Sequence, residues 1–139
     1  MRVLYSFVID HDPRFLLEAE IFLRTLIGAG VSQNDIVAQV TERCGVDGKK
    51  LASRFAVRAV ELPLGPDKTF CNKISQLSTL QGDEFDVLAA CDTDLAILVP
   101  LTDVSRLDAV RARRVDSENP PLDVLENIRR FLGFQERPH

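Results

Sequence analysis

Residues 86–100 read DVLAACDTDLAILVP, and the interpretation of the whole chain depends on this stretch. Its apolar run, Val87–Cys91, has no alternating polar residues, which is typical of a buried strand covered on both faces of a parallel sheet. Asp92 and Asp94 follow at the carboxyl end of this strand, where open α/β sheets bind ligands in the crevice between the strand ends. Two carboxylates there predict a site for a hard divalent cation, Mg²⁺ or Mn²⁺, that also contacts phosphate oxygens.

A second Asp-x-Asp, formed by Asp10 and Asp12, shows that this spacing is not specific on its own. Such carboxylates also serve in turns and helix caps, and that alternative stays open for Asp92 and Asp94. Asp12 stands directly before Pro13, so we interpret it as the N-cap of a helix that begins at Pro13. Asp10 ends the first strand, and in a parallel sheet it faces the same crevice as Asp92.

Strands and helices alternate along the chain, which predicts a Rossmann-like three-layer α/β/α fold with a mostly parallel sheet. We interpret residues 1–139 as one domain, because this length is sufficient for one domain with its own core. The expected strands are residues 3–9, 36–40, 56–62, 87–91 and, as a partly exposed strand, 109–115. The expected helices are residues 15–29, a brief one near 49–55, 69–80 and 122–132. Residues 63–68 are rich in proline and glycine and predict a loop.

The helix expected at residues 69–80 carries a lysine on its apolar side. Its apolar arc consists of Phe70, Ile74, Leu77 and Leu80. At about 100° per residue, Lys73 falls inside this arc. Two interpretations stay open: the lysine stem packs while the ammonium reaches water, or the amine contacts a carboxylate or phosphate at the sheet edge.

Composition limits the classes of function. The formal net charge of −4 leaves no basic excess for a nucleic-acid backbone, so we expect no nucleic acid as a partner. No apolar stretch is long enough for a membrane span, and the early acidic residues argue against a signal peptide, so we expect a cytoplasmic protein. Cys44, Cys71 and Cys91 are widely separated, which predicts free thiols and not disulfides or a structural zinc site.

Three parts of the chain follow in a recognisable order. They are a first strand that ends in an acidic turn, a helix that contains Asn72 and Lys73, and the strand-borne VLAACDTDLAI. In this order they resemble the nucleotide-sugar-binding half of GT-A glycosyltransferases over about the first hundred residues, with the Asp-x-Asp as the most specific signature. The resemblance implies that Asp92 and Asp94 hold Mn²⁺ or Mg²⁺ on the diphosphate of a nucleotide-diphospho-sugar. It also implies that Asp10 contacts the nucleoside and that Lys73 lies near the diphosphate.

In that family the acceptor site and the catalytic base come from a second half, which the resemblance implies is missing here. The catalytic residues therefore stay unknown, and we expect donor binding without sugar transfer. One alternative is a phosphotransfer domain of the haloacid-dehalogenase-like or response-regulator receiver type, because both use aspartates at strand ends. The sequence after Asp10-His11-Asp12 does not fit the hydrolase pattern. The other alternative is a non-catalytic half-domain that binds a nucleotide, a partner chain or a second copy of itself as a homo-oligomer.

Overall fold

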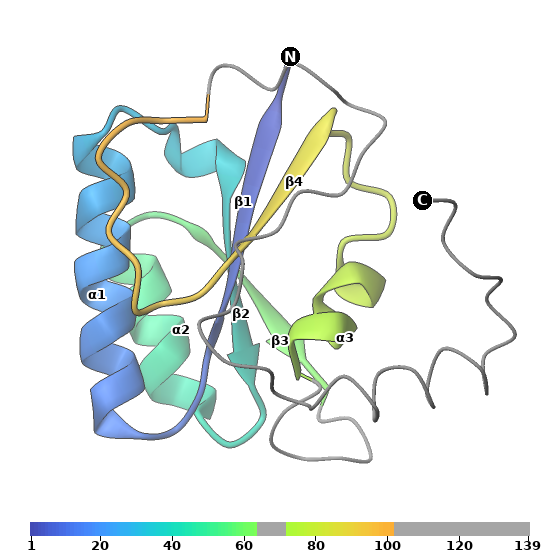
Figure 1. Ribbon diagram of the computed structural model, residues 1–139. Helices are drawn as coiled ribbons and strands as arrows, with labels where there is room; N and C mark the ends of the chain where they lie inside the picture. Colours follow the sequence, from blue (N-terminus) through green and yellow to red (C-terminus); the bar gives the residue numbers. More distant parts are fainter. Residues whose placement is uncertain (64–71, 102–139) are drawn as a thin grey trace, which may run out of the picture. The chain divides into compact units, whose positions relative to one another are not determined.

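The computed structural model describes residues 1–63 and 72–101 (Figure 1). Its elements are β1 Val3–Ile9, α1 Pro13–Gly28, the 3-10 helix η1 Gln33–Asp35, β2 Ile36–Thr41, α2 Gly45–Arg54, β3 Arg58–Leu62, α3 Asn72–Thr79 and β4 Val87–Cys91. The strand expected at 109–115 and the helix expected at 122–132 lie outside the described residues, as do Cys71 and most of the loop expected at 63–68. Within the described ranges, no helix has the length and apolar character that crossing a membrane requires.

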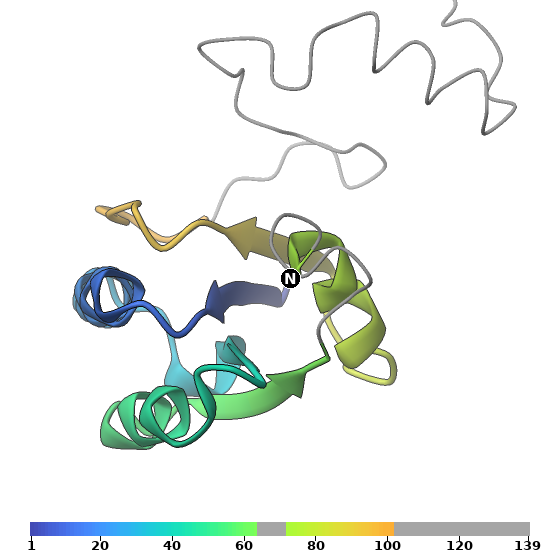
Figure 2. The same ribbon diagram turned by 90° about the horizontal axis from the view of Figure 1, so that it is seen from below.

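Four parallel strands form the sheet, in the order β3-β2-β1-β4. Helices α1 and α2 cover one face and α3 covers the other, as Figure 2 shows along the sheet. This is the predicted three-layer α/β fold. The chain passes from β1 through β2 to β3 and then returns to the other side of β1 to form β4. The strand order therefore reverses between β1 and β4, which is the switch point of such sheets.

Helix α1 begins as the sequence predicts. Asp12 is its N-cap and accepts a hydrogen bond from the backbone N of Arg14 at 2.8 Å, with Pro13 at the first helical position. The buried side chains of this helix are Ala19, Phe22, Leu23 and Leu26. Phe15, on the first turn of the helix, is 41% exposed and does not belong to this buried set.

Helix α2 begins earlier than the brief helix predicted near 49–55, and it includes Gly45 and Gly48. Gly48 lies where α2 packs on β2: a Cβ there would meet Cγ1 of Val40 at 2.6 Å and Sγ of Cys44 at 2.9 Å. This glycine therefore permits close approach of helix and strand. Strand β3 begins later than predicted, since Ala56 has a φ of 52° and belongs to the turn that precedes it.

The prediction of a fully covered strand is wrong for β4. Four of its five residues are half-buried, and the fifth, Ala90, is exposed. Among the described strands β4 stands last in the order, next to β1 alone, and it is β1 that is covered on both faces. The apolar arc expected on α3 is also wrong at Leu77, which is 60% exposed, while its neighbour Gln76 is 1% exposed. Gln76 is buried in place of Leu77 because it forms hydrogen bonds with the polar side chains of Ser6 and Gln39 in the sheet.

Candidate functional site

The carboxyl ends of β1 and β4 bring predicted site residues to one edge of the sheet (Figure 1). The parallel register pairs Phe7 of β1 with Cys91 of β4, so Asp92 comes directly after the last pair. Asp10 comes directly after Ile9, the last residue of β1. Because the strand order reverses between these two strands, this edge is where open α/β sheets bind ligands.

Asp10 is held in place by donors from its own loop and from β2. Its Oδ1 accepts hydrogen bonds from Oγ1 of Thr41 and from the backbone N of His11, both at 2.8 Å, and Nδ1 of His11 lies 3.1 Å away. Burial opposes the charge of this carboxylate, but the hydrogen bonds from His11 and Thr41 outweigh it and lower the pKa of Asp10. Asp10 is therefore a fixed anion at the edge, and Thr41 gives it a structural role in joining β1 to β2. Its contact with a nucleoside stays a prediction.

Asp92 and Asp94 both lie on the exposed side of the chain, while Thr93 between them is half-buried. Oγ1 of Thr93 donates to Oε2 of Glu18 on α1 at 3.4 Å. On the same helix, Arg14 donates to Glu18 at 2.7 Å; this bond raises the pKa of Arg14, and the charge of Asp94 adds to the effect. The alternation thus places both carboxylates toward solvent, next to the first turns of α1.

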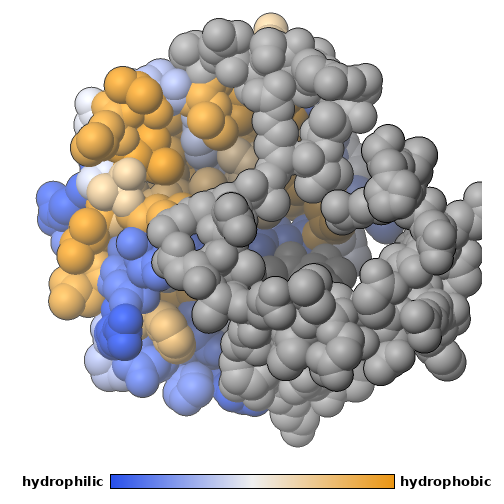
Figure 3. All heavy atoms as spheres, in the orientation of Figure 1, coloured by the Kyte–Doolittle hydropathy of each residue, from blue (hydrophilic) through white to orange (hydrophobic). Residues whose placement is uncertain are grey.

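The segment after Asp94 runs back along α1 and fixes the carboxylates to the scaffold (Figure 1). The backbone N of Ile97 donates to Oγ1 of Thr25 at 3.1 Å, and the backbone N of Leu101 donates to the hydroxyl of Tyr5 at 2.7 Å. Apolar side chains gather over α1 and this segment in Figure 3. The exposed apolar residues of these two elements include Leu17, Ile21, Leu98, Val99 and Leu101.

The donor set at the edge fits one way of binding a metal ion. Among the described residues, no three or more His, Cys, Asp or Glu side chains form a group that could hold a metal. Mg²⁺ does not need such a cage, because it keeps several waters and is held by one or two carboxylates together with substrate phosphates. The pair Asp92 and Asp94 fits that mode with Mg²⁺ or with Mn²⁺, which prefers the same oxygen ligands.

Lys73 lies on the first turn of α3. β3 ends at the carboxyl edge, and α3 then runs back toward the amino edge, where Asp83 binds Arg58 at the start of β3 at 2.5 Å. The first turn of α3 therefore belongs to the same edge as Asp92. The side chain of Lys73 lies outside the described residues, and its contact with the diphosphate stays a prediction.

Sequence reasoning missed Arg14, Glu18 and Thr93. The spacing of Arg14 and Glu18 predicts an ion pair on a helix, and this signal was available. The contact of Glu18 with Thr93 depends on how the segment after β4 returns along α1, which no local signal shows.

Comparison with known proteins adds no family: no protein-family model matches the chain, and no curated protein or solved structure matches it significantly.

Proposed function

We propose that this chain binds a nucleotide-diphospho-sugar through a divalent metal ion, as the donor-binding part of a glycosyltransferase. One observation carries the proposal: Asp92 and Asp94 are exposed carboxylates that follow β4 directly, beside β1, at the point where the strand order reverses. Mn²⁺ or Mg²⁺ bound there supplies positive charge that neutralises the diphosphate leaving group.

The residues at the edge divide the task of binding. Asp92 and Asp94 hold the metal ion, and the hydrogen bond that joins Thr93 to α1 limits how far the two carboxylates move. Asp10 offers a fixed anionic acceptor for the hydroxyl or N–H groups of the nucleoside. Lys73, on the first turn of α3, brings positive charge to the edge for the phosphates.

Titration calorimetry with UDP and GDP tests the metal role. Binding is expected with Mn²⁺ or Mg²⁺ and is expected to vanish in chelator. The double variant Asp92→Asn with Asp94→Asn removes the charges of both proposed ligands and should abolish metal-dependent binding. Glu84→Gln is the control, because it removes an exposed carboxylate close to the start of β4, at the opposite edge of the sheet. Equal binding in chelator, or full metal-dependent binding by the double variant, would show that the proposal is wrong.

A further inference from the structure

The face of the sheet beneath α3 contains buried polar side chains from three elements. Ser6 of β1 and Gln39 of β2 are 0% exposed, Gln76 of α3 is 1% exposed, and Thr79 of α3 is half-buried. Buried polar groups cost free energy unless they find partners, so their arrangement requires an explanation.

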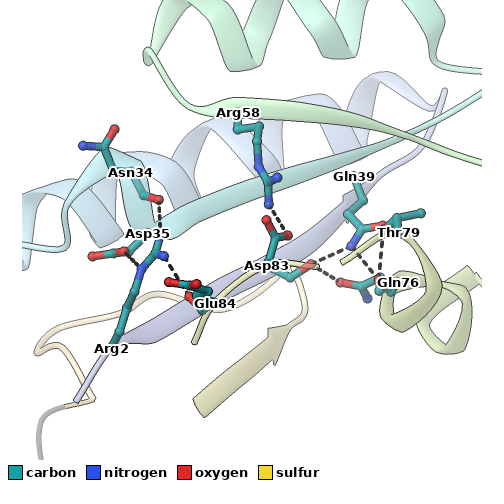
Figure 4. A network of polar contacts seen from close by, with 10 residues as sticks. Arg2, Asn34, Asp35, Gln39, Arg58, Gln76, Thr79, Asp83 and Glu84 are labelled. Carbon is teal, nitrogen blue, oxygen red and sulfur yellow. Dashed lines mark hydrogen bonds and ion pairs between the residues drawn. The ribbon is translucent and has the colours of Figure 1, made fainter. Parts of the chain in front are cut away.

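These four side chains form one hydrogen-bond network, of which Figure 4 labels Gln39, Gln76 and Thr79. Nε2 of Gln39 donates to Oγ of Ser6 at 3.0 Å and to the backbone O of Gln76 at 3.1 Å. Oγ of Ser6 donates to Oε1 of Gln76 at 2.7 Å. Oγ1 of Thr79 lies 2.6 Å from Oε1 of Gln39 and 2.9 Å from the backbone O of Gln76. The carboxamide of Gln39 thus uses both its oxygen and its nitrogen.

Such a network accepts only one position of α3. If the helix shifts along the sheet or rotates about its axis, Gln39 loses its bonds to Gln76 and Thr79, and Ser6 loses its bond to Gln76. The bond between Gln39 and Ser6 stays within the sheet, but the other polar groups are left buried with fewer partners, which is costly. An apolar interface resists such a shift less, because apolar side chains repack with small losses. The buried apolar cluster on this face is small and consists of Leu4, Val37 and Leu80.

The position of α3 on the sheet determines where its first turn lies. The helix runs from the carboxyl edge to the amino edge, where the ion pair of Asp83 with Arg58 follows its last turn. A fixed register on the sheet therefore sets where Asn72 and Lys73 stand along the carboxyl edge.

We propose that Ser6, Gln39, Gln76 and Thr79 are positioning residues for the donor site. They hold α3 in one register, so that its first turn stays at the edge that carries Asp92 and Asp94. The inference rests on the proposed function, so the ligand of the donor site is of the same class: a nucleoside diphosphate with a divalent metal ion.

A pair of variants at Thr79 tests the network. Thr79→Val keeps the shape but removes the hydroxyl, and Thr79→Ser keeps the hydroxyl. In Thr79→Val we expect amide hydrogen exchange in α3 to become about tenfold faster, the size of one lost buried hydrogen bond, with exchange in α1 unchanged. The affinity for UDP with Mn²⁺ is expected to fall by several-fold. Thr79→Ser should keep both values close to those of the wild type.

The control is Val57→Ala, which shortens a buried side chain of the cluster on the opposite face. It should lower the thermal midpoint without changing α3 exchange or UDP affinity. Unchanged α3 exchange in both Thr79→Val and Gln39→Met would overturn the inference. Faster exchange with unchanged UDP affinity would overturn its link to the donor site. If the wild type binds no UDP, the proposed function fails, and α3 exchange alone then decides whether the network positions the helix.

Discussion

The face of the sheet beneath α1 and α2 differs from the face beneath α3 in what it buries. The first face has a large apolar cluster, in which Phe7 and Phe22 meet edge to face with ring centroids 5.1 Å apart. The second face has the small cluster around Leu80 and the polar network centred on Gln39. Apolar burial scales with area and supplies most of the folding free energy, whereas hydrogen bonds contribute little net stability but demand one geometry. The first face therefore stabilises the scaffold, and the second sets the position of α3.

The largest effect is expected on the apolar face. Phe22→Ala removes a fully buried ring and leaves a cavity against Phe7, which should cost about 3–5 kcal/mol of the free energy of unfolding. Urea denaturation followed by circular dichroism measures this loss. Leu17→Ala is the matched control on the same helix, because Leu17 is 60% exposed and should cost little. Similar losses for the two variants would contradict the assignment of stability to this face.

A smaller effect is expected on the polar face. Gln39→Leu removes the buried bonds that Gln39 makes to Ser6, to Thr79 and to the backbone O of Gln76, which should cost about 1–3 kcal/mol in the same urea experiment. Replacing the partners as well, with Ser6→Ala, Gln76→Leu and Thr79→Val, should recover much of this loss, because the interface is then apolar throughout.

The fourfold variant separates stability from position. It should unfold at a urea concentration close to that of the wild type, while α3 exchanges its amides faster because no hydrogen bond selects its register. If the fourfold variant is less stable than Gln39→Leu alone, the network contributes net stability and the contrast between the two faces is wrong.

At the start of α1 we expect an effect of about 1 kcal/mol. Asp12→Ala removes the acceptor for the backbone N of Arg14, and loss of an N-cap costs about this much. Asp12→Ser keeps a capping oxygen and should retain most of the stability, so the two variants together isolate the cap. A loss of several kcal/mol in both would instead assign Asp12 a role outside the cap.

Much of the fold could be predicted because its signals are local. The strand Val3–Ile9 and the cap formed by Asp12 with Pro13 are read from neighbouring residues, and the structure confirms them. The parallel order of β1 and β4 follows from the alternation of strands and helices, so Asp10 and Asp92 could be assigned to one edge.

The polar network could not be predicted, because each of its bonds joins residues far apart in the chain. Gln39 interrupts an apolar run, which alone indicates only a buried amide of unknown partner. On α3 the helical arc favoured Leu77 over Gln76, since the pattern contains no information on polar groups in the facing sheet. The role of Gly48 could not be predicted for the same reason, since only the position of Val40 shows why a glycine is needed there.

The smallest effect is expected at the carboxyl edge of the sheet, where the free energy of unfolding should depend on pH through Asp10. The bonds from His11 and Thr41 lower the pKa of Asp10 below its ordinary value of 3.8 in spite of its burial. The folded chain thus binds this proton less readily than the unfolded chain. The ionised carboxylate therefore stabilises the fold fully above about pH 3.8, and this contribution is lost as the pH falls through the lowered pKa.

Urea denaturation of the wild type and of Asp10→Asn between pH 7 and pH 3 measures this contribution. The difference in unfolding free energy between the two should be largest at neutral pH and should shrink below about pH 4, since the wild-type carboxylate is then protonated in the unfolded chain. Thr41→Val removes one of the stabilising donors, so its stability should depend less on pH than that of the wild type. If the unfolding free energies of wild type and Asp10→Asn depend on pH in the same way, the charge of Asp10 adds nothing to the stability of the fold. The proposed nucleoside contact, which depends on a fixed anion at this edge, would then lose its support.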